Sequence, residues 1–547
     1  MLGRLSPLRS LYVLRQILQH RSFTLSTQRL QRISSGDARV HDFAEAFEYI
    51  SGRWLYNEHL RLSERRLKFN ITALLDAGAR SIGRVTSDVR SFRKLAEGGF
   101  NRVFELTMHD GVQQLTTASE VATMDLVRSH GVPVPKVLDY STDAANSVAA
   151  EYILTEKVCG RSLGDVWFTM SDKERLKVLS AVVDNEAKLF AIDLPASGSI
   201  FYSEDLPRTM ERVALPSNER SSKTLCVGPD ISPKFWFAER SQLGIQRKPF
   251  AAVTEALQGA ALKEIAWLET YGKPRFPRER MYRDITNFQK SQPEEHLESL
   301  RKYLQIAPSL VPKESWLSKP TLRHPDLNSN NIFVSDDYEV VSIIDWQHSR
   351  ALPLFLHTGI THHFRNFGDS QSEALVKPEL PADLDEMHDD RRGYELEKYR
   401  RRHVHFYYAG ATATKYPRHF DASMHEGGLF RRRIDEHAAQ PWEGNSIPLK
   451  ADLIHLTQEW SQFAESQDGP PPCPLSFEAE EAERVLQGAL KQEEADNKLE
   501  IVRNYMEAGS DGWSARMKAQ VLENADNDEE REEVERYWMF DDFDEEE

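Results

Sequence analysis

The chain contains 547 residues with a net charge of −17, and hydrophobic residues make up 40% of it. This length allows about three to four folding units, and the apolar share is enough for a packed core. The acidic balance argues against a nucleic-acid partner, which needs a basic surface, and no stretch approaches the ~18 apolar residues of a membrane span. Three widely spaced cysteines exclude a disulfide framework and a cysteine-based zinc site.

The charge is unevenly distributed along the chain. Residues 1–36 hold six arginines, six serines and no acid, which is typical of a mitochondrial transit peptide. A disordered basic tail is the alternative. Residues 521–547 hold fourteen acids and two arginines, and such a tail is usually solvated. Its aromatic residues Trp538, Phe540 and Phe543 suggest, as a second possibility, that the tail docks onto a protein partner.

The N-terminal third is predicted to be rich in β-structure. Val85–Thr107 reads as two short strands around the turn Gly98-Gly99, because apolar and polar residues alternate with a period of two. A helix is expected over Thr117–His130, followed by a buried strand within Ala149–Val158.

Helical periodicity then dominates, at Asp172–Ile192, Val253–Tyr271, Phe477–Glu507 and Ala515–Trp538. We therefore expect an α+β chain with two lobes and a helical, acidic C-terminal extension. The expected divisions are a leader at 1–36, a small β-rich lobe at 37–160, a helical lobe at 161–467, and a proline-rich linker with charged helices and the acidic tail at 468–547.

The strongest chemical signal lies between His324 and Asp345. Two short apolar strands flank a turn centred on Tyr338, and folding this hairpin places Asn331 opposite Asp345. Oxygen ligands of this kind hold Mg²⁺ together with phosphate oxygens. Asp326 lies close enough to face the same site, where a carboxylate accepts the proton of a hydroxyl that attacks a γ-phosphate. His324 is expected to brace the loop by hydrogen bonding.

The pattern His-x-Asp-(x)₄-Asn followed by Ile-Asp-Trp resembles the signature of the aminoglycoside/choline phosphotransferase branch of the protein-kinase-like fold. Asp42–Trp54, Glu97–Phe104, Ala118–Val137 and the acidic C-terminus resemble the fungal mitochondrial phosphotransferase-like family called altered inheritance of mitochondria protein 9. The resemblance implies a two-lobe protein-kinase-like fold, a mitochondrial location, and the use of ATP and Mg²⁺.

The resemblance also implies roles for single residues. Asp326 would be the catalytic base, and Asn331 and Asp345 would be the Mg²⁺ ligands. Gly98 and Gly99 would form the loop over the phosphates, where the missing Cβ atoms let backbone N–H groups approach.

Three further positions match the nucleotide-binding part of the family. Glu120 would be the helix carboxylate that pairs with a basic residue on the third strand. Glu156 and Val158 would belong to the hinge that binds adenine through its backbone.

The expected basic residue on the third strand is missing from this sequence. No lysine or arginine occurs between Arg102 and Arg128, and only eight residues separate the turn at Asp110-Gly111 from Glu120. Three explanations stay open: a gene model that lacks part of an exon, a degenerate kinase, or a substitute cation such as Lys94 or Arg102.

Two functions follow from these observations. The first is a mitochondrial kinase that transfers the γ-phosphate of ATP to a hydroxyl of a small-molecule acceptor, and the acidic body of the chain would suit a cationic acceptor. The second is a catalytically degenerate, kinase-like scaffold in mitochondrial maintenance or inheritance. The intact set of Asp326, Asn331 and Asp345 favours the first, and the missing basic residue favours the second.

Overall fold

The computed structural model describes residues 53–54, 57–65, 69–97, 102–108, 118–143, 145–216, 223–236, 238–464, 471–506 and 513–514. Several predicted features lie outside these residues and stay predictions: the basic segment 1–36, Gly98-Gly99, Asp110-Gly111, the helix over Ala515–Trp538 and the acidic tail 521–547. None of the described helices is long and apolar enough to cross a membrane.

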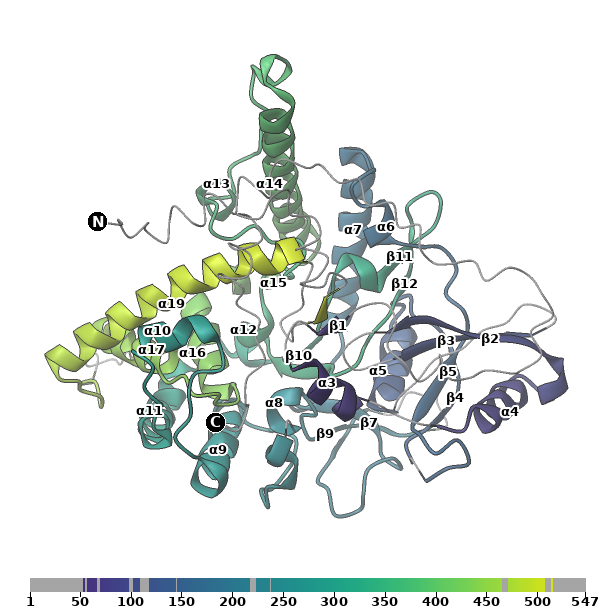
Figure 1. The fold of residues 1–547 in the computed structure, drawn as a ribbon, viewed down its shortest axis with the longest axis horizontal. Coiled ribbons are helices and arrows are strands. Elements are labelled where there is room, and N and C mark those ends of the chain that lie inside the picture. Colours follow the sequence, from purple (N-terminus) through teal and green to yellow (C-terminus); the bar gives the residue numbers. More distant parts are fainter. Residues whose placement is uncertain are drawn as a thin grey trace, which may run out of the picture.

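Two antiparallel hairpins and two helices form most of the described N-terminal part of the fold. Their bounds are α4 Ile71–Ser81, β2 Val89–Glu97, β3 Arg102–Met108, α5 Ala118–Ser129, β4 Val137–Ser141 and β5 Tyr152–Thr155. Strand β2 pairs with β3, and β4 pairs with β5. Figure 1 shows these elements together at one side of the molecule. Within the described residues no strand separates β3 from α5, where the resemblance implies one.

Short elements at the two ends of the described chain meet. They are β1 Arg53–Trp54, α3 Glu58–Arg65 and β14 Trp513–Ser514. Strands β1 and β14 pair antiparallel, so segments more than 450 residues apart in the sequence lie side by side.

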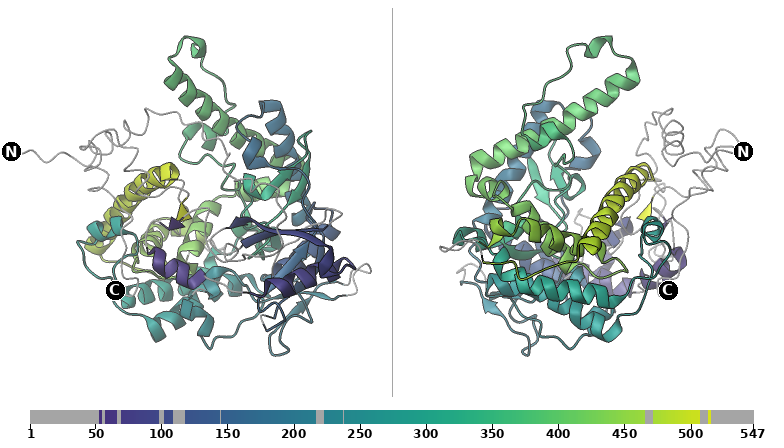
Figure 2. Two further views of the ribbon diagram at one scale, coloured as in Figure 1. Left: turned by 45° about the vertical axis from the view of Figure 1, so that its right-hand side comes forward. Right: turned by 90° about the vertical axis from the view of Figure 1, so that its left-hand side faces the viewer.

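The rest of the described chain is mainly helical, as predicted. Its helices are α6 Leu163–Val166, α7 Asp172–Phe190, α8 Pro233–Trp236, α9 Val253–Tyr271, α10 Arg280–Ile285, α11 Pro293–Ile306, α12 Leu354–His357, α13 Ser370–Glu373, α14 Asp389–Lys415, α15 Pro417–Ser423, α16 Gly428–Ala439, α17 Ile447–Gln458, α18 Trp460–Phe463 and α19 Ala479–Met506. Figures 1 and 2 show one end of α14 projecting from the body. The α+β class expected from the sequence is confirmed, with small sheets and mostly helical content.

In the described part of the chain, eight further short strands form three small sheets. They are β6 Arg161–Ser162, β7 Ser199–Tyr202, β8 Val213–Ala214, β9 Leu225–Gly228, β10 Pro320–Arg323, β11 Ile332–Val334, β12 Val340–Ile343 and β13 Arg350–Pro353. Strand β11 lies between β12 and β6, and β10 pairs with β13. The chain that leaves the small lobe through β6 is therefore fixed against the hairpin that carries the sequence motif.

The predicted register of that hairpin is wrong by one residue. Ile332 pairs with Ile343, and the N–H of Ile344 donates to the Asn331 carbonyl at 2.9 Å, so Asn331 faces Ile344 instead of Asp345. The cause is the position of the turn: Val334 pairs with Val340, so the hairpin is centred on Asp337 and not on Tyr338. An extra residue on the β12 side, between the pairs of Phe333 and Val334, then reduces the mismatch from two residues to one. Asp345 consequently begins the segment that follows the hairpin.

One hydrophobic core connects the small lobe with the motif hairpin. Val121 and Val127 of α5 are buried in the same cluster as Ile332 of β11 and Trp346. A shared core fixes the position of a helix because burying its apolar face is what stabilises it. Glu120, in the first turn of α5, is thereby held against the end of the hairpin.

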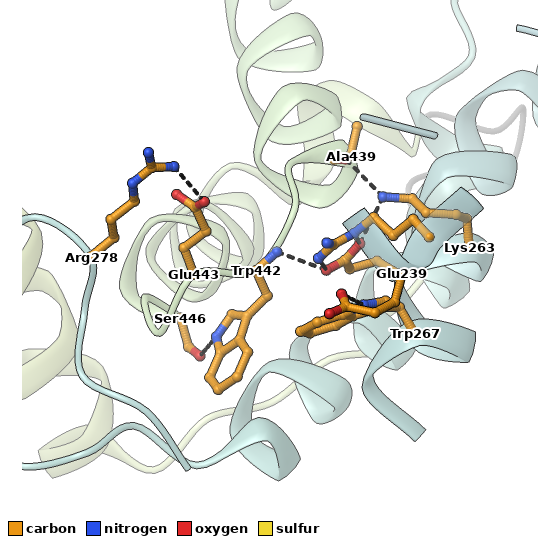
Figure 3. A network of polar contacts seen from close by, with 10 residues as sticks. Glu239, Lys263, Trp267, Arg278, Ala439, Trp442, Glu443 and Ser446 are labelled. Carbon is orange, nitrogen blue, oxygen red and sulfur yellow. Dashed lines mark hydrogen bonds and ion pairs between the residues drawn. The ribbon is translucent and has the colours of Figure 1, made fainter. Parts of the chain in front are cut away.

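A second core lies among α9, α11, α16 and α17, and a buried ion network crosses it. The Glu264 carboxylate of α9 accepts hydrogen bonds from Arg240 Nε at 2.8 Å and Lys263 Nζ at 2.7 Å. Burial opposes ionisation of Glu264, but these two cations outweigh it and hold its pKa at about 2. The Trp442 N–H also donates to Glu264 at 2.7 Å, which ties the α16–α17 connection to α9 (Figure 3).

The C-terminal helix is docked onto the helical lobe. Residues Ala495 and Leu499 of α19 are buried, and the Gln492 side-chain amide donates to Asn445 Oδ1 at 3.0 Å. Lys450 of α17 forms an ion pair with Glu481. Helix α19 thus has the bounds that the sequence predicts, to within two residues, and packs as part of the body.

Candidate active site

The loop between β10 and β11 is held by one neutral histidine. His324 is buried, its Nδ1 accepts the Asp326 N–H at 3.1 Å, and its Nε2 therefore donates to the Ile344 carbonyl at 2.9 Å. Burial lowers the pKa of His324 to about 4, although the Ile344 carbonyl and Asp326 oppose this shift. The ring also packs edge-on against Trp346, with centroids 4.6 Å apart. His324 thus joins the loop to the end of the hairpin.

Amide side chains fix the shape of the loop around Asp326. Asn331 Nδ2 donates to the Asp326 carbonyl at 2.9 Å, and Asn328 Nδ2 donates to Asp326 Oδ2 at 2.8 Å. Asn328 Oδ1 accepts the N–H groups of Asn330 and Asn331, at 2.8 and 3.3 Å. Among the described residues nothing donates to Asn331 Oδ1, so this oxygen is available to a ligand. The sequence-based prediction omitted Asn328, although an asparagine three residues before Asn331 is a typical side-chain cap.

Asp345 stands in a strained backbone conformation next to these groups. Its φ of +64° lies in the left-handed region, which costs a non-glycine residue on the order of 1 kcal/mol or more and recurs at functional sites. Its surroundings remove water from the carboxyl, and this desolvation, together with the negative charge of Asp326, raises the pKa of Asp345. The carboxylate of Asp326 is therefore close enough to Asp345 to disfavour its ionisation.

Glu120 completes this acidic group from the other lobe. Its Oε1 accepts the Trp346 N–H at 2.9 Å, so α5 is bonded to the residue directly after Asp345. Burial, and then the charge of Asp345, raise the pKa of Glu120 to about 8.

The hydrogen-bond partner of Glu120 among the described residues is a backbone N–H, that of Trp346, and not the basic side chain of the family pattern. Within the described part of the chain no lysine or arginine forms an ion pair with Glu120. Lys94 and Arg102, the two candidate substitute cations, lie on β2 and β3. The structure does not describe their side chains, so this explanation stays a prediction.

The oxygen groups of the site fit a hard divalent cation. The charge of Asp345 disfavours ionisation of Glu120, the charge of Asp326 disfavours ionisation of Asp345, and a bound cation would relieve this repulsion. No three His, Cys, Asp or Glu side chains converge as a metal cage among the described residues. Mg²⁺ is usually held by only one or two protein carboxylates plus phosphate oxygens and water, which this donor set can supply.

The connection between β5 and β6 contains Glu156 and Val158, the predicted hinge residues. The Glu156 N–H donates to the Lys136 carbonyl at 2.9 Å, and its carboxylate accepts the Lys136 N–H at 3.0 Å. Val158, half-buried, has no hydrogen-bond partner among the described residues. Gly160 has a φ of +109°, and a Cβ there would lie 2.5 Å from the Val334 carbonyl of β11. The connection is thus packed closely against the motif hairpin.

A cavity of about 690 Å³ opens on the other side of Asp326. It is lined by His324 and Asp326, by parts of β13 and α12, and by α16. Asn331, Asp345, Glu120 and the connection 156–160 do not line it. Asp326 therefore lies at a boundary, with the oxygen-rich group on one side and the cavity on the other.

Comparison with known proteins identifies the family of this chain. Residues 87–388 match the phosphotransferase enzyme family, and this match covers more than half of the chain. The chain belongs to the phosphotransferase enzyme family. The matched range includes the whole motif from His324 to Asp345 as well as Glu120, the residue contributed by the small lobe.

Relatives of this phosphotransferase occur in fungi. A subtelomeric hrmA-associated cluster protein of Aspergillus fumigatus is 31% identical over 465 residues, which are 77% of this chain and 88% of that protein. Altered inheritance of mitochondria protein 9, mitochondrial, from Candida glabrata is 24% identical over 388 residues, which are 63% of this chain and 58% of that protein.

Solved structures resemble this chain less closely than the fungal relatives do. A thermostable mutant of aminoglycoside phosphotransferase APH(4)-Ia, in a ternary complex with ADP and hygromycin B, aligns with a TM-score of 0.31 and 13% identity. That alignment covers 70% of this chain and 95% of the other.

Proposed function

We propose that this protein is an ATP-dependent kinase that phosphorylates a hydroxyl of a small molecule. The observation that carries the proposal is the boundary position of Asp326. Asp326 is exposed, its loop is fixed by His324, Asn328 and Asn331, and it lies between the oxygen-rich group and the cavity. A general base needs this placement because it must reach the acceptor hydroxyl while that hydroxyl faces the γ-phosphate.

The reaction is an in-line displacement at phosphorus. The acceptor oxygen forms a bond to the γ-phosphorus, and the bond from that phosphorus to the β,γ-bridging oxygen breaks with its electron pair leaving on ADP. The hydroxyl proton passes to Asp326. The products are a phosphate monoester, ADP and one proton, which balances the reaction.

The other residues position the nucleotide. The Glu156 carbonyl and the Val158 N–H would bind adenine, and Gly98-Gly99 would cover the phosphates. Asn331 and Asp345 would hold Mg²⁺, which neutralises charge that develops on the phosphate oxygens. Glu120 holds the segment after Asp345 through the Trp346 N–H, and so keeps Asp345 in its strained conformation.

A kinase-like scaffold without catalysis is the second candidate. It is favoured by the absence, among described residues, of a cation beside Glu120 and of a strand between β3 and α5. Sequencing the transcript across codons 105–125 separates a gene-model error from a genuine loss. A cDNA that encodes the short version contradicts the gene-model explanation.

Mitochondrial import is part of the proposal. It is supported by the composition of residues 1–36 and by relatives that are named as mitochondrial. A fluorescent protein fused to residues 1–36 should enter mitochondria, and a fusion that stays in the cytosol contradicts import.

Thermal stabilisation by Mg-ATP tests the kinase proposal directly. A ligand at 100 times its dissociation constant stabilises the folded state by about 2.7 kcal/mol. We expect this stabilisation for the wild type, little for Asp345→Ala, and the full value for Asp383→Ala, which removes an exposed carboxylate elsewhere. A correctly spliced wild-type protein that Mg-ATP does not stabilise is the outcome that supports the scaffold instead.

A further inference from the structure

The cavity beside Asp326 is basic although the chain as a whole is acidic. Its lysine and arginine side chains are Lys234, Arg323, Arg350, Arg365, Arg432 and Arg433. Its acidic side chains are Asp326, Asp435 and Glu436. The net acidity of the chain predicted a cationic acceptor, whereas the side chains that line this cavity favour an anionic one.

Most of the basic side chains have carboxylate partners that hold them in place. These pairs are Arg323 with Glu186 at 3.0 Å, Arg350 with Asp230 at 2.8 Å, Lys234 with Glu436 at 3.2 Å, and Arg433 with Asp452 at 2.8 Å. Paired charges of this kind shape the wall of a cavity but add little net charge to it.

Arg432 differs from these because it has no carboxylate partner among the described residues. It extends from α16, is half-buried, and uses only Nη1, which donates to the Phe355 carbonyl at 3.3 Å and to the Thr358 hydroxyl. Nothing in the described part of the chain accepts from its Nε or Nη2. A guanidinium presents these donors as a planar fork that matches a carboxylate or a phosphate.

The surroundings of Arg432 leave its charge uncompensated. Burial lowers the pKa of Arg432 to about 10, and the nearby positive charge of Arg323 contributes to this shift. The remaining acids of the wall are engaged elsewhere: Asp435 accepts the Tyr303 hydroxyl at 3.1 Å, and Glu436 faces Lys234. A partly buried, unpaired cation is costly, and an anionic ligand would offset that cost.

We infer that the acceptor is an anion, a small hydroxylated molecule with a phosphate or carboxylate group that Arg432 binds while its hydroxyl faces Asp326. This inference rests on the proposed kinase function. The cavity of about 690 Å³ accommodates a molecule of this class.

Binding without nucleotide tests the inference separately from catalysis. Four probes that share a small hydroxylated skeleton are titrated calorimetrically: glycerol 3-phosphate, glycerate, choline and glycerol. The wild type should bind the two anions more tightly than choline and glycerol, and the ratio between the anions shows whether phosphate or carboxylate is preferred. Tighter binding of choline than of either anion overturns the inference.

Substitution of Arg432 locates the binding site. Arg432→Gln should weaken binding of the preferred anion by about tenfold or more, because a charge-assisted pair of hydrogen bonds is lost. Arg432→Lys keeps the charge without the fork and should recover part of the affinity. Arg301→Gln removes an exposed arginine outside the cavity and should change nothing. Equal affinity in the wild type and a folded Arg432→Gln protein overturns the inference.

Two further measurements keep the inference distinct from the proposed function. Asp345→Ala should lose stabilisation by Mg-ATP and still bind the anion, because Asp345 does not line the cavity. Mg-ADP should not displace the anion from the wild type. Displacement would assign the anion to the nucleotide side and overturn the inference, whereas a missing Mg-ATP shift alone contradicts only the kinase function.

Discussion

The two sides of Asp326 have opposite chemistry. On one side, Asn331, Asp345 and Glu120 present oxygen atoms, and the two carboxylates have raised pKa values because they are desolvated and close to another carboxylate. On the other side, the cavity wall is basic and Arg432 is unpaired by any described carboxylate. The first side suits a cation and the second suits an anion. In the proposed reaction, Asp326 would therefore lie between the metal–nucleotide complex and an anionic acceptor. The net charge of a protein therefore says little about one wall of one cavity.

The largest expected effect comes from the residue that both sides share. Asp326→Asn should lower the rate of ADP formation from Mg-ATP, with the preferred anion present, by about 10² to 10⁴-fold, because the hydroxyl proton loses its acceptor. Anion binding should be kept or slightly strengthened, because the substitution removes a negative charge from the cavity wall. Mg-ATP stabilisation should persist, since the amide has nearly the same size and shape as the carboxylate it replaces. The rate is measured with a coupled assay. If the Asp326→Asn variant keeps most of the wild-type rate, Asp326 is not the base.

The nucleotide side depends on close packing of the connection between the lobes. Gly160→Ala should reduce the free energy of unfolding by about 3 kcal/mol, because the φ of +109° disfavours a Cβ and the Val334 carbonyl lies 2.5 Å from its position. Gly131→Ala is a matched control, with a φ of +80° and no atom within 4 Å, and should cost about 1 kcal/mol. Urea denaturation compares the two. Equal losses would mean that the contact with β11 is not needed to hold the connection.

The acceptor side contains a carboxyl whose titration affects stability. Burial raises the pKa of Asp435 from 3.8 to about 6, so the folded state holds its proton more tightly than the unfolded chain does. The stabilisation that protonated Asp435 gives to the folded state is fully present below pH 3.8 and is lost as the pH rises through 6.

Replacing this carboxyl therefore has a pH-dependent outcome. Asp435→Asn should raise the free energy of unfolding by about 2 kcal/mol at pH 8 and leave it nearly unchanged at pH 4. The amide oxygen can still accept the Tyr303 hydroxyl. The change should also strengthen anion binding slightly, because it removes a negative charge from the wall. A stability gain of the same size at both pH values contradicts the raised pKa.

The sequence by itself determined the local features of this protein. Helix α9 has the predicted bounds because its apolar residues repeat with helical spacing, and α7 and α19 end within two residues of theirs. The motif from His324 to Asp345 could also be recognised, because its residues lie within one loop and one hairpin. Even there the register was wrong by one residue, because the turn is centred on Asp337 and not on Tyr338, and a bulge in β12 offsets only part of that shift. Neither the turn centre nor the bulge leaves a periodic signal in the sequence.

Only the tertiary structure decided which distant residues face one another. Glu120 bonds the Trp346 N–H across 226 positions of sequence, because α5 and the hairpin share one core. The basic side chains beside Asp326 come from α8, β10, β13, the segment after α12, and α16, so no sequence window contains them all. Whether a charge is compensated depends on the partner that packing brings within hydrogen-bonding distance, as the contrast between Arg323, paired with Glu186, and Arg432, bonded only to neutral oxygens, demonstrates.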